Sequence, residues 1–107
     1  MLTDYSKMSD FEINCKVAKA NNWTSKSFLH EIHSGEWNPC QNAADAWHII
    51  DENNITIIND HPEIRYAVNN LNAYRNGDNN CIVKSDPNGL RAAMIVFLMM
   101  QDARNEK

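Results

Sequence analysis

The stretch that most constrains this 107-residue chain is an apolar run over residues 90–100, in which Arg91 is the only polar side chain. A helix from about 87 to 104 is expected, with Ser85 or Asp86 as its N-cap. The middle of such a helix is apolar on every side and must be covered on most sides. We therefore expect it to lie at the centre of the fold, and a symmetric homodimer is expected as a further way to cover it.

Composition places the chain among soluble globular proteins, and its length fits one domain, residues 1–107. The formal net charge is -4, and the ten Lys and Arg residues are spread along the sequence, which argues against the basic patch that nucleic-acid binding needs. Three widely spaced cysteines and a polar N-terminus without a signal peptide indicate free thiols in a reducing cytoplasm. A membrane span is not expected, because the apolar run is shorter than the roughly 20 residues that cross a bilayer.

The remaining patterns predict an α+β fold. Ser9 and Glu12 have the spacing of a capping box at the start of a helix over 9–20, and Asn42 is the expected N-cap of a helix that ends near Glu52. Strands are predicted over residues 23–33, 55–58, 64–69 and 81–84. We expect a small antiparallel sheet of three to four strands packed against about three helices, with the C-terminal helix central.

The apolar patterns of the first two helices indicate what each of them buries. Ala43, Ala46, Trp47 and Ile50 form the predicted buried stripe of the second helix. Asn14 falls inside the apolar arc of the first helix, where it is either a satisfied amide that bridges core elements or a group that lines a pocket. Bridging is favoured, because buried polar groups usually find a partner.

The candidate binding site is the segment 37–47, which brings two tryptophans, a proline and several amides to the start of a helix. Trp37 follows Gly35 in a turn and has no periodic reason to be buried. We therefore expect Trp37 to be an exposed binding anchor, with Asn42 and Asp45 as its polar rim. The alternative is a structured loop whose tryptophans plug the core.

No pattern in the chain predicts a catalytic residue, a metal site or a cofactor. His30 and His33 stand three apart in a predicted strand, which would point them to opposite faces, and no third ligand is nearby. Cys40 and His48 suggest a thiol and its base, but a half-buried loop cysteine is favoured. We predict a non-enzymatic module that binds an unidentified protein; the alternative is a small enzyme or small-ligand-binding protein with a pocket at 37–47.

Three segments resemble the NinX-like family of small proteins from lambdoid phages and prophages. They are DYSKMSDFEIN at 4–14, the stretch from NPC to DAWHII at 38–50, and LRAAMIVFLMM at 90–100. The resemblance implies a phage accessory protein in the host cytoplasm, without established activity or catalytic residues to transfer. The family pattern has proline at the position of His48, which would start the second helix near that residue, and the stretch 21–36 has no firm counterpart in it.

Overall fold

The structure, a computed structural model, describes residues 4–105. Its elements are a 3-10 helix at Tyr5–Lys7, α1 (Asp10–Ala20), α2 (Lys26–Ser34), α3 (Ala43–Glu52), β1 (Thr56–Ile58), β2 (Arg65–Val68), α4 (Leu71–Arg75), β3 (Val83–Asp86) and α5 (Gly89–Asn105). The strands form one antiparallel sheet in the order β1-β2-β3. This is the α+β arrangement that the sequence predicts, although the described residues form more helices than expected.

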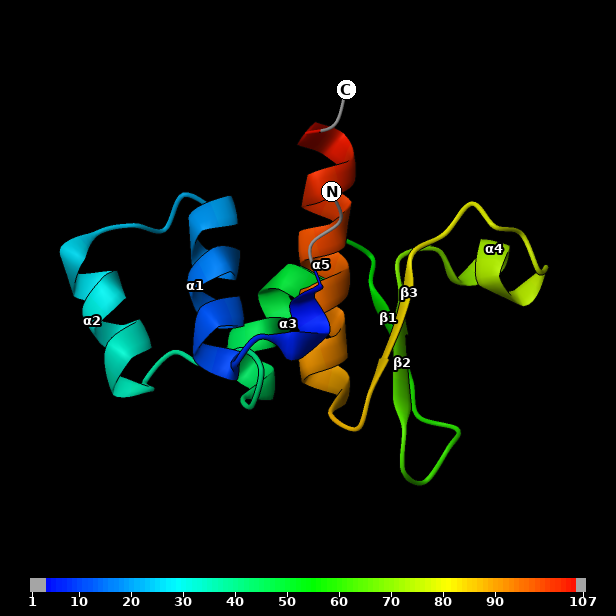
Figure 1. Ribbon diagram of the computed structural model, residues 1–107, viewed down its shortest axis with the longest axis horizontal. Coiled ribbons are helices and arrows are strands. Elements are labelled where there is room, and N and C mark those ends of the chain that lie inside the picture. Colours follow the sequence, from blue (N-terminus) through cyan, green and yellow to red (C-terminus); the bar gives the residue numbers. More distant parts are fainter. Residues whose placement is uncertain (1–3, 106–107) are drawn as a thin grey trace.

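The C-terminal helix α5 lies at the centre, as predicted. Figure 1 shows α5 between α1 and the sheet, with α2 on the outer side of α1 and α4 on the side of the sheet away from α5. Residues 92–98 are all buried, so one chain covers this stretch on every side. At the start of α5, a Cβ on Gly89 would lie 2.9 Å from the Cγ2 atom of Ile57, so the close passage over β1 favours glycine. None of the helices within residues 4–105 is long and apolar enough to cross a membrane.

The approach to α5 differs from the prediction. Asn88 is the N-cap, because its Oδ1 accepts from the backbone N–H of Leu90 at 2.9 Å, whereas the side chain of Asp86 accepts from the N–H of Asn88 itself. β3 runs from Val83 to Asp86, so it begins and ends two residues later than the strand predicted at 81–84. Pro87, which has no N–H to donate to a ladder, ends the strand.

The first helix and the next two strands are confirmed. α1 begins after Ser9 with the complete capping box, in which the side chains of Ser9 and Glu12 each accept from the other residue's backbone N–H. β1 and β2 pair in a register that sets Ile57 opposite Ala67. The short helix α4, capped by the side chain of Asn70, is an element that the sequence did not predict.

The strand predicted at 23–33 is wrong, because this stretch forms α2. The side chain of Ser25 accepts from the N–H of Phe28 at 3.2 Å and starts the helix. Gly35, at a φ of 83°, ends it in the left-handed conformation. Phe28 and Ile32 stand one helical turn apart and face the interior, a spacing that the apparent alternation of the stretch had concealed.

Candidate functional site

The helix that carries the predicted site begins where its cap predicted. The side-chain oxygen of Asn42 accepts from the N–H of Ala44 at 2.9 Å and from that of Asp45 at 3.4 Å. The start of α3 therefore lies at Ala43, and the alternative start near His48 is wrong.

A hydrogen bond joins one side of α3 to the loop before it. The Oδ2 atom of Asp45 accepts from the backbone N–H of Asn38 at 2.9 Å, which holds this side of the helix against the preceding loop. The residues that α3 buries are Ala46, Ile49 and Ile50. Trp47 lies outside this buried set and is 63% exposed. The predicted stripe is therefore wrong for Ala43 and Trp47, because the helix is rotated to bring Ile49 inward.

Trp37 is buried, with only 8% of its surface exposed, so the prediction that it is exposed is wrong. Its backbone N–H donates to the carbonyl oxygen of Glu31 at 3.2 Å, which folds the chain back over the end of α2. Its ring lies edge-on to Trp23 at a centroid distance of 5.9 Å and 4.9 Å from the ring of Phe28. The alternative of a tryptophan that plugs the core thus describes Trp37, but not Trp47.

A pocket of about 560 Å³ opens between this aromatic cluster and α3. We call it the aromatic pocket; its lining includes Trp23, Phe28, Trp37, Ala44, Asp45 and His48. Two of the three predicted site residues, Trp37 and Asp45, therefore line one pocket, while the third, Asn42, caps the helix beside it. The volume falls within the range of small-molecule sites.

The exposed side of α3 borders this pocket. We call it the α3 face, and its exposed residues are Ala43, Ala44, Trp47, His48, Asp51 and Glu52. Trp47 stands out, because the next most exposed large apolar side chain among the described residues, Phe11, is 42% exposed. A second hollow of about 280 Å³ lies against Trp47, and Ile50, Asp51 and Ile55 contribute to its lining.

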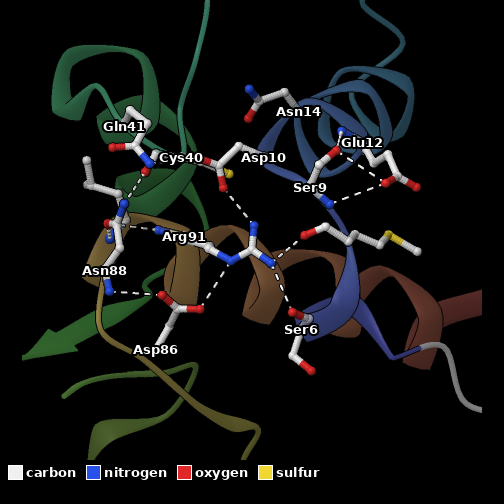
Figure 2. Close-up of polar contacts among 12 residues, drawn as sticks. Ser6, Ser9, Asp10, Glu12, Asn14, Cys40, Gln41, Asp86, Asn88 and Arg91 are labelled. Atoms are coloured by element: carbon white, nitrogen blue, oxygen red, sulfur yellow. Dashed lines mark hydrogen bonds and ion pairs between the residues drawn. The ribbon is translucent and has the colours of Figure 1, made fainter.

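Arg91 fixes the elements beneath the site. Figure 2 shows its guanidinium extended between Asp10 and Asp86. The two ion pairs measure 2.7 Å to Asp10 and 3.1 Å to Asp86, and the Nη2 atom donates to the backbone oxygens of Ser6 and Met8. One largely buried cation thus joins α1, β3, α5 and the chain before α1. Sequence reasoning missed this role, although a lone arginine in an apolar run is a signal for a paired buried charge.

The same network holds the loop that leads into α3. The side-chain amide of Asn88 donates to the carbonyl oxygen of Cys40 at 2.7 Å, and that of Gln41 donates to Asp10 at 2.6 Å (Figure 2). On the other side, the Nδ2 atom of Asn14 donates to the side chain of Asn38 at 2.9 Å. Asn14 therefore bridges α1 to this loop, but its buried Oδ1 atom accepts no hydrogen bond from the described residues, so the amide is only half satisfied. It also lines a hollow of about 230 Å³, so both roles that the sequence left open apply to it in part. The loop is fixed to both α1 and α5.

A profile of the family described as Bacteriophage P22, NinX matches residues 4–101. The chain belongs to this family. The NinX match includes the Arg91 network, the aromatic pocket and the α3 face, and it makes the chain a phage accessory protein. No curated protein and no solved structure was found to match.

The Cys40 and His48 pair of this NinX chain does not have the surroundings of a nucleophile and its base. Cys40 is fully buried, and burial, followed by the nearby Asp10 carboxylate, raises the pKa of its thiol to about 12. His48 is exposed and contacts Glu52 at 2.9 Å. Cys40 is therefore a buried, uncharged thiol at neutral pH, whereas the imidazole of His48 lies at the surface.

The two histidines at 30 and 33 of this NinX chain lie on α2, not on a strand. The helix places His30 and His33 on neighbouring parts of its surface, so the expected opposite orientation is wrong. Between residues 4 and 105, no group of three or more His, Cys, Asp or Glu side chains is arranged to hold a metal ion.

Proposed function

We propose that this phage accessory protein acts without catalysis, by binding another protein in the cytoplasm of the bacterial host through the α3 face and the aromatic pocket. The observation that carries the proposal is Trp47, which is 63% exposed on a helix whose other large apolar residues are buried. Tryptophan is among the residues that contribute most to protein–protein binding.

The surroundings of Trp47 support docking of a partner. Ala43 and Ala44 are small and exposed, so they leave space for a partner to approach the indole along the helix. Hollows of about 560 and 280 Å³ lie on the two sides of the α3 face, and each can accept a side chain. The indole N–H of Trp47 donates no hydrogen bond within the described part of the chain, so it is available to a partner.

The predicted site residues have distinct roles in this proposal. Trp37 forms part of the apolar floor of the aromatic pocket, and Asp45 lies on its polar side. Asn42 holds the first turn of α3 and thereby the position of both hollows. Trp47 replaces Trp37 as the anchor, because it is the tryptophan that a partner can reach.

Site-specific photo-crosslinking tests the proposal. A photoreactive amino acid at position 47, in a protein produced in phage-infected bacteria, should give a discrete adduct with one other protein. Position 74 is the matched control, because Tyr74 is an exposed aromatic residue (39%) on the distant helix α4. Adducts at position 47 that are no stronger or more specific than those at position 74 would contradict the proposal.

A second candidate, binding of a small ligand, is favoured by the size and aromatic lining of the same pocket. The chain offers a matched pair of variants to test it. Ala44→Leu places a larger side chain in the aromatic pocket. Ala43→Leu makes the same change at the neighbouring exposed position of α3, which does not line the pocket. Small molecules that bind the protein are first identified by ligand-detected NMR. For a molecule that occupies the aromatic pocket, the NMR signal of binding should disappear with Ala44→Leu and persist with Ala43→Leu.

The homodimer expected from the sequence remains a prediction. Its original reason was the need to cover the C-terminal helix, and one chain already buries residues 92–98. Self-association would have to use another surface. Light scattering from micromolar to millimolar concentration measures it, and a monomer mass throughout would remove the homodimer from the proposal.

A further inference from the structure

The inference that follows rests on the proposed function and names the chemistry of the partner. We infer that the α3 face binds a basic protein segment, in which Lys or Arg side chains flank an apolar side chain. Three observations lead to it: the distribution of charge along the chain, the charge at the end of α3, and the placement of carboxylates beside Trp47.

Charge is strongly segregated along the sequence. From residue 27 to residue 64 there is no Lys or Arg, although the chain has ten. The same stretch holds seven of the fourteen carboxylates, so its formal charge is -7, while the ten cations and seven carboxylates elsewhere give +3. Lys26, the first residue of α2, is the last cation before this stretch. The α3 face and much of the aromatic pocket lie within it.

The end of α3 carries charge of the sign that a helix end disfavours. The C-terminus of a helix is the negative end of its dipole, so basic residues stabilise the last turn and acidic residues destabilise it. The other four α-helices between residues 4 and 105 each carry a basic residue there, namely Lys19, His33, Arg75 and Arg104. α3 has none and instead ends with Asp51 and Glu52. Glu52 contacts the side chain of His48 at 2.9 Å, whereas Asp51 has no such contact with a described residue, so the charge of Asp51 in particular opposes helix stability.

The carboxylates lie where a bound cation would also meet the indole. Asp51 follows Trp47 by one helical turn, and both line the smaller hollow together with Ile50 and Ile55. Asp51 forms no ion pair with any residue that the structure describes, so its charge is available. An Arg or Lys side chain in this hollow would pack its stem on the isoleucines and its charge between indole and carboxylate. Arginine suits the position best, because its planar group stacks on aromatic rings.

Charge also argues against two other possible occupants of this face, a second copy of the chain and a nucleic acid. A two-fold symmetric contact between two copies would bring the α3 face of one chain against the same surface of the other. This face carries Asp51 and Glu52 but no Lys or Arg, so two acidic surfaces would meet, and like charges in contact disfavour binding. Nucleic acid would place phosphates against the same carboxylates. A basic segment of a different protein is the occupant that the charge favours.

Selection from a library of displayed random peptides tests the inference on the intact protein. We expect the enriched peptides to contain more Lys and Arg than the starting library, together with an aromatic or aliphatic residue. A synthetic peptide of the enriched sequence should bind less tightly as salt rises. The double neutralisation Asp51→Asn with Glu52→Gln should weaken its binding by about tenfold or more.

A matched control separates local charge from net charge. Asp60→Asn with Glu63→Gln removes the same two charges from the β1–β2 turn, within the same acidic stretch but outside the α3 face. Its affinity for the peptide should stay within about twofold of the original. Circular dichroism is the control for folding, and it should show both double variants and Trp47→Ala folded like the original protein. Equal weakening by the two double variants would overturn the inference, because it would show only an effect of net charge.

The remaining outcomes separate this inference from the proposed function. Enriched peptides that need Trp47 but carry no excess of Lys and Arg would overturn the basic-partner inference and leave the docking site in place. Basic peptides that bind equally well to Trp47→Ala would place the basic site elsewhere and overturn the inference. If no selected peptide depends on Trp47, both the inference and the proposed docking site are contradicted.

Discussion

The loop before α3 and the outer face of α3 adjoin in sequence, yet they treat apolar residues in opposite ways. The loop buries Trp37, Pro39 and Cys40, although it has no regular secondary structure along much of its length. The helix exposes Trp47, its largest apolar side chain. Regular secondary structure therefore does not predict burial here, because the irregular loop buries its large apolar residues and the helix leaves its largest one exposed.

A loop can be buried only if its backbone polar groups find partners inside the protein. Here the N–H of Trp37 donates to Glu31, the N–H of Asn38 donates to Asp45, and the carbonyl oxygen of Cys40 accepts from Asn88. These partners lie on α2, on α3 and at the start of α5. The loop is therefore fixed by its neighbours, whereas the α3 face makes few contacts that fold stability requires.

The largest effect expected from this comparison is that of Trp37→Ala. Removing a buried indole that packs against Trp23 and Phe28 should lower the free energy of unfolding by about 3–5 kcal/mol. Urea unfolding followed by circular dichroism measures the change, and one cooperative transition would also support the single domain predicted over residues 1–107. A loss below about 1 kcal/mol would show that the loop is not part of the core.

Arg91→Met comes second. It keeps an unbranched apolar stem but leaves Asp10 and Asp86 without their cation, and breaking a buried ion pair costs about 3–5 kcal/mol. Because the Asp10 side chain is 31% exposed and that of Asp86 is 16% exposed, solvent screens part of this loss, and we expect about 2–3 kcal/mol. Arg75→Met on the exposed end of α4 is the control. Equal losses in the two variants, measured by urea unfolding, would remove Arg91 from its structural role.

The sequence predicted the fold best where local signals agree with tertiary packing. The capping box at Ser9, the Asn42 cap and the apolar run of the last helix each act within a few residues, and each is confirmed. The stretch 23–33 failed because its apparent alternation outweighed the Ser25 cap and the terminal Gly35, which together mark a helix.

The candidate site was harder to predict, because distant residues decide which side of α3 is buried. Helical spacing allows two buried stripes on α3. Both contain Ala46 and Ile50, but one adds Trp47 and the other adds Ile49, and the local sequence does not distinguish them. The observed orientation packs Ile49 in the core and includes the hydrogen bond from the backbone N–H of Asn38 to Asp45, and no local pattern marks either contact. Proximity of Trp37 and Asp45 in sequence did predict that they lie together, in the aromatic pocket.

The third prediction concerns the charge of the α3 face. Asp51→Lys replaces an acid in the last turn of α3 with a base, so it should raise the free energy of unfolding by about 0.3–1 kcal/mol. The control Asp60→Lys makes the same change in charge away from any helix end. A gain in stability that both variants share would come from the lower net charge, and it would contradict the role of the helix end.

Trp47→Ala should have the smallest effect on stability, and it completes the contrast with Trp37. The indole is 63% exposed, so its removal takes little apolar surface out of the core. Alanine also has the higher helix propensity, by a few tenths of a kcal/mol, which offsets the lost contacts. We therefore expect a change within about 0.5 kcal/mol. Acrylamide quenching provides a second measurement. Trp47→Ala should remove the most readily quenched component of tryptophan fluorescence, because Trp23 is half-buried and Trp37 is only 8% exposed. If the variant instead unfolds as easily as Trp37→Ala, the side chain contributes to the core, and the α3 face is no longer a candidate for docking.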